Sequence, residues 1–180
     1  MNTELRQAAP GDYDRIVTVM DEWWGRPIRS GLPRLFLDHF FRTSLVAEDG
    51  GRPGALAGFL VGFLSDADRE TAYIHFVGVA PGHRGGGLAR RLYARFFELA
   101  RADGRSVVRS VTSPRNTASI AFHTALGFTV TGPFTDYDGP SEDRMCFRRG
   151  LDAFPSGPAE AAHGTAAADG APARRGQHGD

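Results

Sequence analysis

A glycine-rich turn between an extended segment and a helical one constrains the fold most. Residues 71–80 are rich in Tyr, Ile, Phe and Val and end at Pro81-Gly82, which predicts a strand followed by a turn. After Gly85-Gly86-Gly87, apolar residues recur at helical spacing: Leu88, Leu92, Phe96 and Leu99. Such a turn exposes several backbone N–H groups beside the positive end of a helix dipole, and glycine lets a ligand approach closely. The segment therefore predicts a pyrophosphate-binding site.

Two well-known phosphate-binding motifs do not describe this turn. The G-x-G-x-x-G spacing of dinucleotide-binding folds is not met in its usual place after the first strand. No G-K-[ST] follows the glycines either, which excludes a P-loop there. The pyrophosphate of another cofactor is expected.

Helical and extended patterns alternate through residues 1–150. Strands are expected at 5–8, 44–48, 55–64, 71–80, 106–112, 128–131 and 144–148. Helices are expected from Asp12, over 33–41, from Leu88 to a stop at Gly104, and over 117–126. The predicted order is β-α-α-β-β-β-α-β-α-β-β.

Residues 151–180 have a different character. More than half of them are Ala, Gly or Pro, and no aromatic residue follows Phe154. A segment of this composition buries too little apolar surface to offset its ordering entropy. We expect one folded domain over 1–150 and a disordered tail over 151–180.

Charge and cysteine content narrow the function classes. Lys+Arg and Asp+Glu both number 21, so no broad basic surface for nucleic acid or an anionic membrane is expected. Cys146 is the only cysteine, which excludes an internal disulfide and a cysteine-rich zinc site, and we expect no metal. No apolar run approaches the roughly 18 residues of a membrane helix, and the first residues lack a signal core. The expected compartment is the cytoplasm.

Two motifs resemble those of the GNAT N-acetyltransferases. Arg84-Gly85-Gly86-Gly87-Leu88-Ala89 matches the R/Q-x-x-G-x-G/A signature of that family and follows a V-x-P strand end at Val79-Ala80-Pro81. Asn116 to His123, followed by Leu126-Gly127-Phe128, resembles the N-x-x-[AS]-x-x-[FL]-Y-x-x-x-G-F block. The resemblance covers residues 3–149, and the predicted element order agrees with it.

The resemblance implies a fold and a cofactor. It implies the α/β (α+β) GNAT fold, in which a mixed, mostly antiparallel sheet of six or seven strands is flanked by about four helices. That sheet is splayed at the strand that binds acetyl-CoA, which is the cosubstrate. Backbone groups of Val77 and Val79 would pair with the pantetheine. The remaining residues that match the family's cofactor contacts are Arg84, Gly85, Gly86, Gly87, Leu88, Ala89, Asn116, Ser119 and Phe122.

The resemblance also implies direct attack of an amine on the thioester. The Val79 N–H corresponds to the donor that stabilises the oxyanion, a contact that can contribute about 3 kcal/mol. His75 stands where many relatives have Glu, and strand alternation predicts that it shares a face with Val77 and Val79. His123 stands where many relatives have the Tyr that protonates the thiolate. We expect His75 as base and His123 as acid; a structural role stays open for both.

The amine acceptor is expected near the end of the first helix. Glu22, Trp23, Trp24 and Arg26 form a cluster of charge and aromatic rings, of which one tryptophan is expected in the core. A small amine or amino-acid-like metabolite would suit this mixture. Acetylation of a protein N-terminus or lysine, and a non-catalytic acetyl-CoA sensor, stay open. The resemblance is compatible with a homodimer, although no self-complementary patch requires one.

Overall fold

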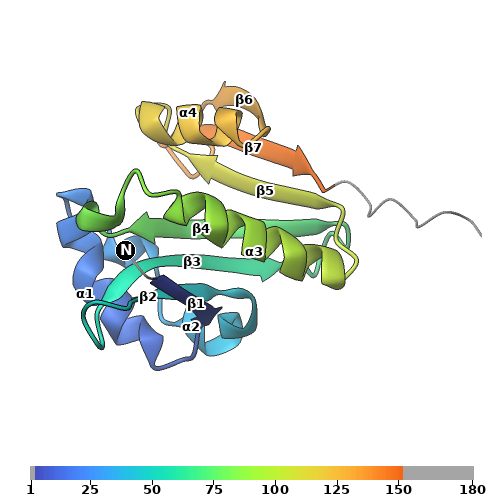
Figure 1. Cartoon of the computed structure of the whole chain (residues 1–180). Coiled ribbons are helices and arrows are strands. Elements are labelled where there is room, and N and C mark those ends of the chain that lie inside the picture. Colours follow the sequence, from blue (N-terminus) through green and yellow to red (C-terminus); the bar gives the residue numbers. More distant parts are fainter. Residues whose placement is uncertain (1–2, 152–180) are drawn as a thin grey trace, which may run out of the picture.

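A seven-stranded mixed sheet forms the centre of the protein in the computed structural model, which describes residues 3–151 (Figure 1). Its strand order is β1-β2-β3-β4-β5-β7-β6, and only the β4–β5 pair is parallel. The strands are β1 (Thr3–Gln7), β2 (Leu45–Asp49), β3 (Leu56–Leu64), β4 (Thr71–Val79), β5 (Val107–Thr112), β6 (Thr129–Phe134) and β7 (Arg144–Gly150). The α-helices are α1 (Asp12–Trp24), α2 (Leu35–His39), α3 (Leu88–Ala102) and α4 (Thr117–Ala125). The expected fold class and element order are confirmed.

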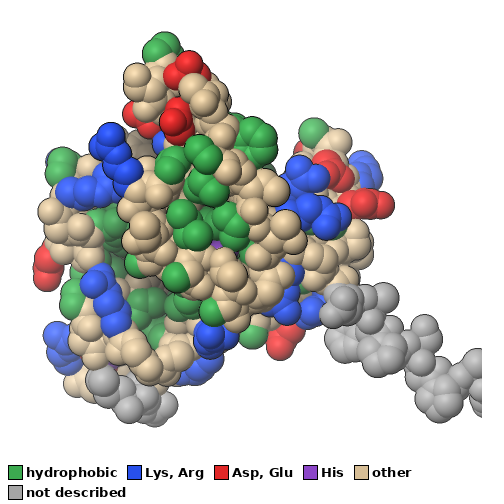
Figure 2. Space-filling view, turned by 90° about the horizontal axis from the view of Figure 1, so that it is seen from above, with side chains coloured by type: hydrophobic (Ala, Val, Ile, Leu, Met, Phe, Trp, Pro, Cys, Tyr) green, Lys and Arg blue, Asp and Glu red, His purple; other side chains and the backbone are tan. Residues whose placement is uncertain are grey.

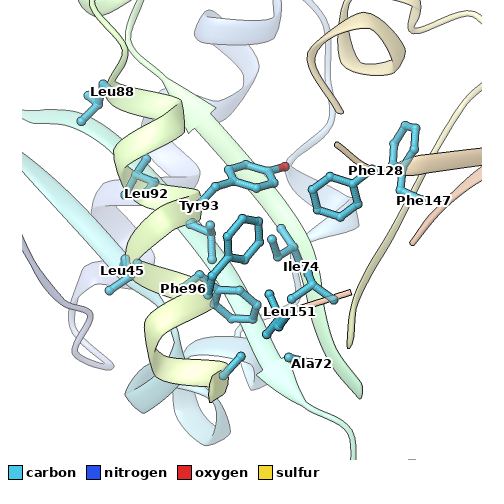
Figure 3. Close-up of a cluster of buried hydrophobic side chains, with 14 of the residues drawn as sticks. Leu45, Ala72, Ile74, Leu88, Leu92, Tyr93, Phe96, Phe128, Phe147 and Leu151 are labelled. Carbon is cyan, nitrogen blue, oxygen red and sulfur yellow. The ribbon is translucent and has the colours of Figure 1, made fainter. Parts of the chain in front are cut away.

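Two hydrophobic clusters hold the helices on opposite faces of the sheet. One cluster joins α3 and α4 to the sheet through residues such as Leu92, Phe96 and Phe147 (Figure 3). The other joins α1 and α2 to the sheet through Ile16, Leu37 and Phe59. Each face is therefore covered by one helix pair, and β3 and β4 contribute side chains to both clusters.

The parallel strands β4 and β5 stay together over a short distance only. Thr71, Ala72 and Tyr73 pair with Val107, Val108 and Arg109, and no later residue of β4 pairs with β5. Figure 1 shows the two strands diverging toward their arrowheads. The second half of β4 thus has a partner strand on its β3 edge and none on its β5 edge.

A β-bulge in β4 changes the side on which His75 lies. Phe76 is opposite Val61 and Ile74 is opposite Gly62, so His75 is an extra residue without a partner on β3. His75 stacks on Phe36 of α2, on the α1/α2 side, whereas Val77 packs with the α3/α4 cluster. The prediction that His75 shares a face with Val77 and Val79 is wrong, because simple alternation cannot place an extra residue.

Leu151, which the sequence analysis assigned to the tail, is packed in the core. Leu151 is only 5% exposed, belongs to the α3/α4 cluster, and donates its N–H to the Ser106 carbonyl at 2.7 Å. The rest of the expected tail lies outside the described residues. Within the described residues, no helix combines the length and apolar character needed to cross a membrane.

Close packing of α3 on β3 depends on a missing side chain. A Cβ on Gly62 would lie 2.5 Å from Cε2 of Phe96 and 2.9 Å from the Tyr73 carbonyl oxygen. We expect Gly62→Ala to lower the free energy of unfolding by about 1–3 kcal/mol, because the helix must shift to admit the methyl group. Urea unfolding measures this change. Gly11→Ala is the control, since nothing lies within 4 Å of its Cβ position; equal losses in both variants would contradict the argument.

Candidate active site

The turn before α3 presents a row of backbone N–H groups with no acceptor. Gly85 and Gly87 have φ of 79° and 78°, a left-handed conformation that glycine adopts without strain. No side chain caps α3, and no acceptor within residues 3–151 meets the N–H groups of residues 85–90. Six donors at a helix N-terminus are suited to bind an anion. The Arg84 N–H, which the motif predicted as a pyrophosphate donor, instead donates to the Pro81 carbonyl. The Arg90 N–H is a further free donor that the motif did not indicate.

The Arg84 side chain fastens this turn to two other elements. Its Nε donates to the carbonyl oxygen of Val79 at 3.2 Å, and its Nη2 donates to the carbonyl oxygen of Trp23 at 2.6 Å. The end of β4, the end of α1 and the glycine turn are thereby held together. The guanidinium is already engaged within the protein, so its role at this site is to position the turn.

Two backbone N–H groups of β4 face the open edge of that strand. Ala80 donates its N–H to the Ala57 carbonyl of β3 at 2.9 Å. N–H groups of successive strand residues alternate between the two edges, so those of Val79 and Val77 face away from β3. No strand pairs with that edge of β4 beyond Tyr73. An extended ligand could bind there as an added strand.

His75 is held as a neutral ring at the bulge. Its Nε2 lies 2.9 Å from the Gly31 carbonyl oxygen, which only accepts, so Nε2 carries the proton and Nδ1 carries the lone pair. Its ring stacks on Phe36 with centroids 4.0 Å apart. Burial lowers the pKa of His75, although the Gly31 contact opposes this effect. A neutral imidazole with a free lone pair is suited to accept a proton near pH 7.

Comparison with known proteins settles the family. The family model described as "Acetyltransferase (GNAT) family" matches residues 13–128. The chain belongs to this acetyltransferase family. The matched region includes the glycine turn, the open edge of β4 and α4.

Two relatives of known name each match this chain over about half of their own length. The chain is 40% identical over 87 residues to L-methionine sulfoximine/L-methionine sulfone acetyltransferase of Salmonella typhimurium, covering 48% of this chain and 50% of the relative. It is 32% identical over 92 residues to L-2,4-diaminobutyric acid acetyltransferase of Nocardia farcinica, covering 51% and 46%. The chain therefore spans about half the length of these curated relatives.

One similar solved structure carries a cofactor. It is yncA of Salmonella typhimurium, described as an acetyltransferase with its cofactor acetyl-CoA. The identity is 25%, the TM-score is 0.65, and the match covers 95% of this chain and all of the other. The likeness extends over the whole GNAT fold.

The expected cofactor residues of α4 have partners inside the protein. Asn116 caps α4: its Oδ1 accepts from the Ser119 N–H at 3.2 Å, and its Nδ2 donates to Thr112 Oγ1 at 3.1 Å. Phe122 is half-buried against Tyr93 of α3. These contacts fix the N-terminal turn of α4 relative to β5 and α3.

The surroundings of His123 do not support an acid role. Its Nδ1 donates to the Ser119 carbonyl at 2.8 Å, and its Nε2 accepts from the Tyr93 hydroxyl at 2.9 Å. The ring stacks on Phe147 with centroids 3.8 Å apart, and it is 5% exposed. Burial lowers the pKa of His123, against the opposing effect of the Ser119 contact. The ring is therefore neutral, whereas the predicted acid has to be charged.

Only two of the four expected acceptor residues lie together. Trp23 is 7% exposed and stacks on Phe59, so it is the core tryptophan. Trp23 and the exposed Glu22 line a surface groove of about 780 Å³ between α1, the β2–β3 hairpin and residues 80–82. Arg26 is exposed beyond the helix. Trp24 alone packs against β4, on Phe76.

Residues that the motifs missed fix the loop beside His75. Asp21 accepts from the N–H groups of Ile28 and Arg29 at 2.7 and 2.9 Å, which shapes the loop leading to Gly31. That loop contains Gly31, whose carbonyl oxygen accepts the hydrogen bond from His75. An acidic residue followed by a Gly-containing loop was the available signal, and it does not distinguish a loop cap from a substrate ligand.

The free donors of the glycine turn predict the effect of a methyl group there. We expect Gly85→Ala to weaken coenzyme A binding at least tenfold, because an L-residue resists φ near 79° and the turn must change shape. Isothermal titration calorimetry measures the affinity. Gly104→Ala imposes the same strain at the other end of α3, where φ is 78°, and should leave the affinity unchanged. Equal affinities in both variants would refute the site.

The buried His123 predicts a pH-dependent stability. Its pKa is lower in the folded state than the reference value of about 6.5, so the unfolded state binds more protons below that pH. The free energy of unfolding should therefore fall as the pH is lowered through about 6.5. We expect His123→Asn to flatten this fall between pH 7.5 and 5.5 in urea titrations. His39→Gln, at an exposed position, is the control, and an unchanged slope for His123→Asn would disprove the assignment.

Proposed function

We propose that the protein is an acetyl-CoA-dependent N-acetyltransferase of small amines. The observation that carries this proposal is the combination of six free N–H donors at the start of α3 with an unpaired edge of β4. The N–H donors at the start of α3 suit a pyrophosphate, and the unpaired edge of β4 suits the amide groups of pantetheine. The named relatives act on small amino compounds, and yncA has acetyl-CoA as its cofactor, which supports both substrates.

The side of the protein on which α4, β6 and β7 lie in Figure 1 carries apolar and basic side chains together. Figure 2, seen from that side, shows hydrophobic side chains gathered in the middle of the face, with basic side chains around them. The basic side chains are arginine, since the sequence contains no lysine.

The residues of this chain would assist direct attack of the amine on the thioester. The amine nitrogen forms a bond with the thioester carbon and gives a proton to Nδ1 of His75, whose Nε2–H stays bonded to Gly31. The Val79 N–H stabilises the oxyanion that develops on the carbonyl oxygen. The carbon–sulfur bond then breaks, and coenzyme A leaves as a thiolate that takes a proton from solvent. We propose a structural role for His123, because both of its nitrogens are engaged.

Thiol release from acetyl-CoA against a panel of amines tests the proposal. We expect turnover with at least one class of amine, and a loss in kcat of about a hundredfold or more in His75→Ala, as for removal of a general base. The affinity for acetyl-CoA should stay within twofold of the parent, because His75 lies on the α1/α2 side of the sheet.

The pH profile separates a base from a structural histidine. In the parent, kcat at saturating amine should rise with pH through the lowered pKa of His75. His75→Gln keeps a side-chain donor for Gly31 but should lose this inflection. Binding of acetyl-CoA without acetylation of any amine would favour a sensor instead.

A further inference from the structure

A row of half-buried aromatic rings lies beside His75 on the α1/α2 side of the sheet. Phe36 of α2 stacks on His75 at 4.0 Å, and Phe63 of β3 lies 6.2 Å from Phe36. Tyr73 of β4 stacks on Phe63 at 5.2 Å, and Phe40 lies 5.2 Å from Phe63. We call Phe36, Phe40, Phe63 and Tyr73 the aromatic row.

Three members of the row take no part in the protein's core. Phe40, Phe63 and Tyr73 belong to neither hydrophobic cluster, and all three are only half-buried. The Tyr73 hydroxyl has no hydrogen-bond partner among the side chains and backbone groups of residues 3–151. Adjacent rings that stay partly exposed leave apolar surface in contact with water, and a ligand can bury that surface. Such a patch is typical of a binding surface.

The orientation of the rings selects the kind of ligand. Phe36 is nearly parallel to His75, with an interplanar angle of 12°, and Phe63 is nearly parallel to Tyr73, at 22°. Each stacked pair covers one face of each of its rings, so less ring face is left for a cation. The four rings carry no charge, so they leave an ammonium group without an ion-pair partner and favour an apolar or aromatic substituent.

The charged groups near the row lead to the same conclusion. Burial chiefly raises the pKa of the Tyr73 hydroxyl, and the nearby Asp138 contributes in the same direction. Asp138 is not free to bind an ammonium group, because it pairs with Arg144 at 2.7 Å. Glu142 pairs with Arg144 as well, at 3.0 Å. Asp138 and Glu142 thus share the one guanidinium of Arg144, which engages the carboxylate that lies near Tyr73.

We propose that the aromatic row binds the substituent of the acceptor, which is a primary monoamine carrying an aromatic or large apolar group. This inference rests on the proposed function, in which the amine lies at His75. Phe36 of the row stacks on His75, and the row continues from Phe36 to Phe63 and Tyr73. An amine at His75 therefore places its substituent along these rings, whereas a diamine would place an unpaired charge there.

Matched pairs of amines test this proposal. L-Phenylalanine is compared with L-alanine, 2-phenylethylamine with ethylamine, and L-2,4-diaminobutyric acid serves as the diamine. We expect kcat/KM to be at least tenfold higher for the aromatic member of each pair, and the diamine to be the poorest acceptor. Phe63→Leu and Tyr73→Leu should each lower the aromatic-to-small ratio at least threefold.

Phe41→Leu is the matched control. Phe41 is also half-buried, but it packs with the α1/α2 cluster and its ring forms no stacked or edge pair with the row, so the ratio should not change. Equal use of the small or diamine acceptors, or an unchanged ratio in both row variants, overturns the inference while the acetyltransferase activity stands. Failure to acetylate any amine overturns the proposed function as well.

Discussion

The unpaired edge of β4 is the constraint on which the rest of this structure depends. A parallel pair normally continues along both strands, but β5 leaves β4 after Tyr73. The backbone groups of Val77 and Val79 then lack the ladder partners that strand residues require. Pairing with β3 holds this half of β4 in the sheet, and two further contacts fix its ends. One end is held by the remaining three-residue pairing with β5, and the other by Arg84 on the Val79 carbonyl.

The same arrangement gives one strand two functions. The β3 edge of β4 is paired along its length except at the His75 bulge, so the strand keeps its place in the sheet. Its free edge meets the N-terminal turn of α3, where six further N–H groups lack acceptors. The bulge then directs His75 to the opposite side, toward α2 and Gly31. In the proposed function, cofactor and acceptor would therefore be bound from two sides of a single strand.

Much of the fold could be predicted from sequence because its signals are local. Glycine stops, turn residues and apolar periods predicted every α-helix and strand in order, and the two motifs identified the family. The bulge at His75 has no such signal, because it depends on the pairing of β3 with β4. Nor does the sequence show that Asn116, His123 and Arg84 form hydrogen bonds inside the protein, since those partners are set by tertiary contacts.

The two tryptophans show why site residues are harder to predict than elements. Trp23 and Trp24 are adjacent, so a helix sends their side chains about 100° apart, and only one can share the core face. Trp23 is that residue, while Trp24 bridges Phe59 and Phe76 and lies against Gly78. The sequence pointed to this cluster because acidic groups and an indole face can hold a cationic amine. In the structure the indoles hold α1 against β3 and β4, a tertiary role that the sequence pattern cannot distinguish from a substrate contact.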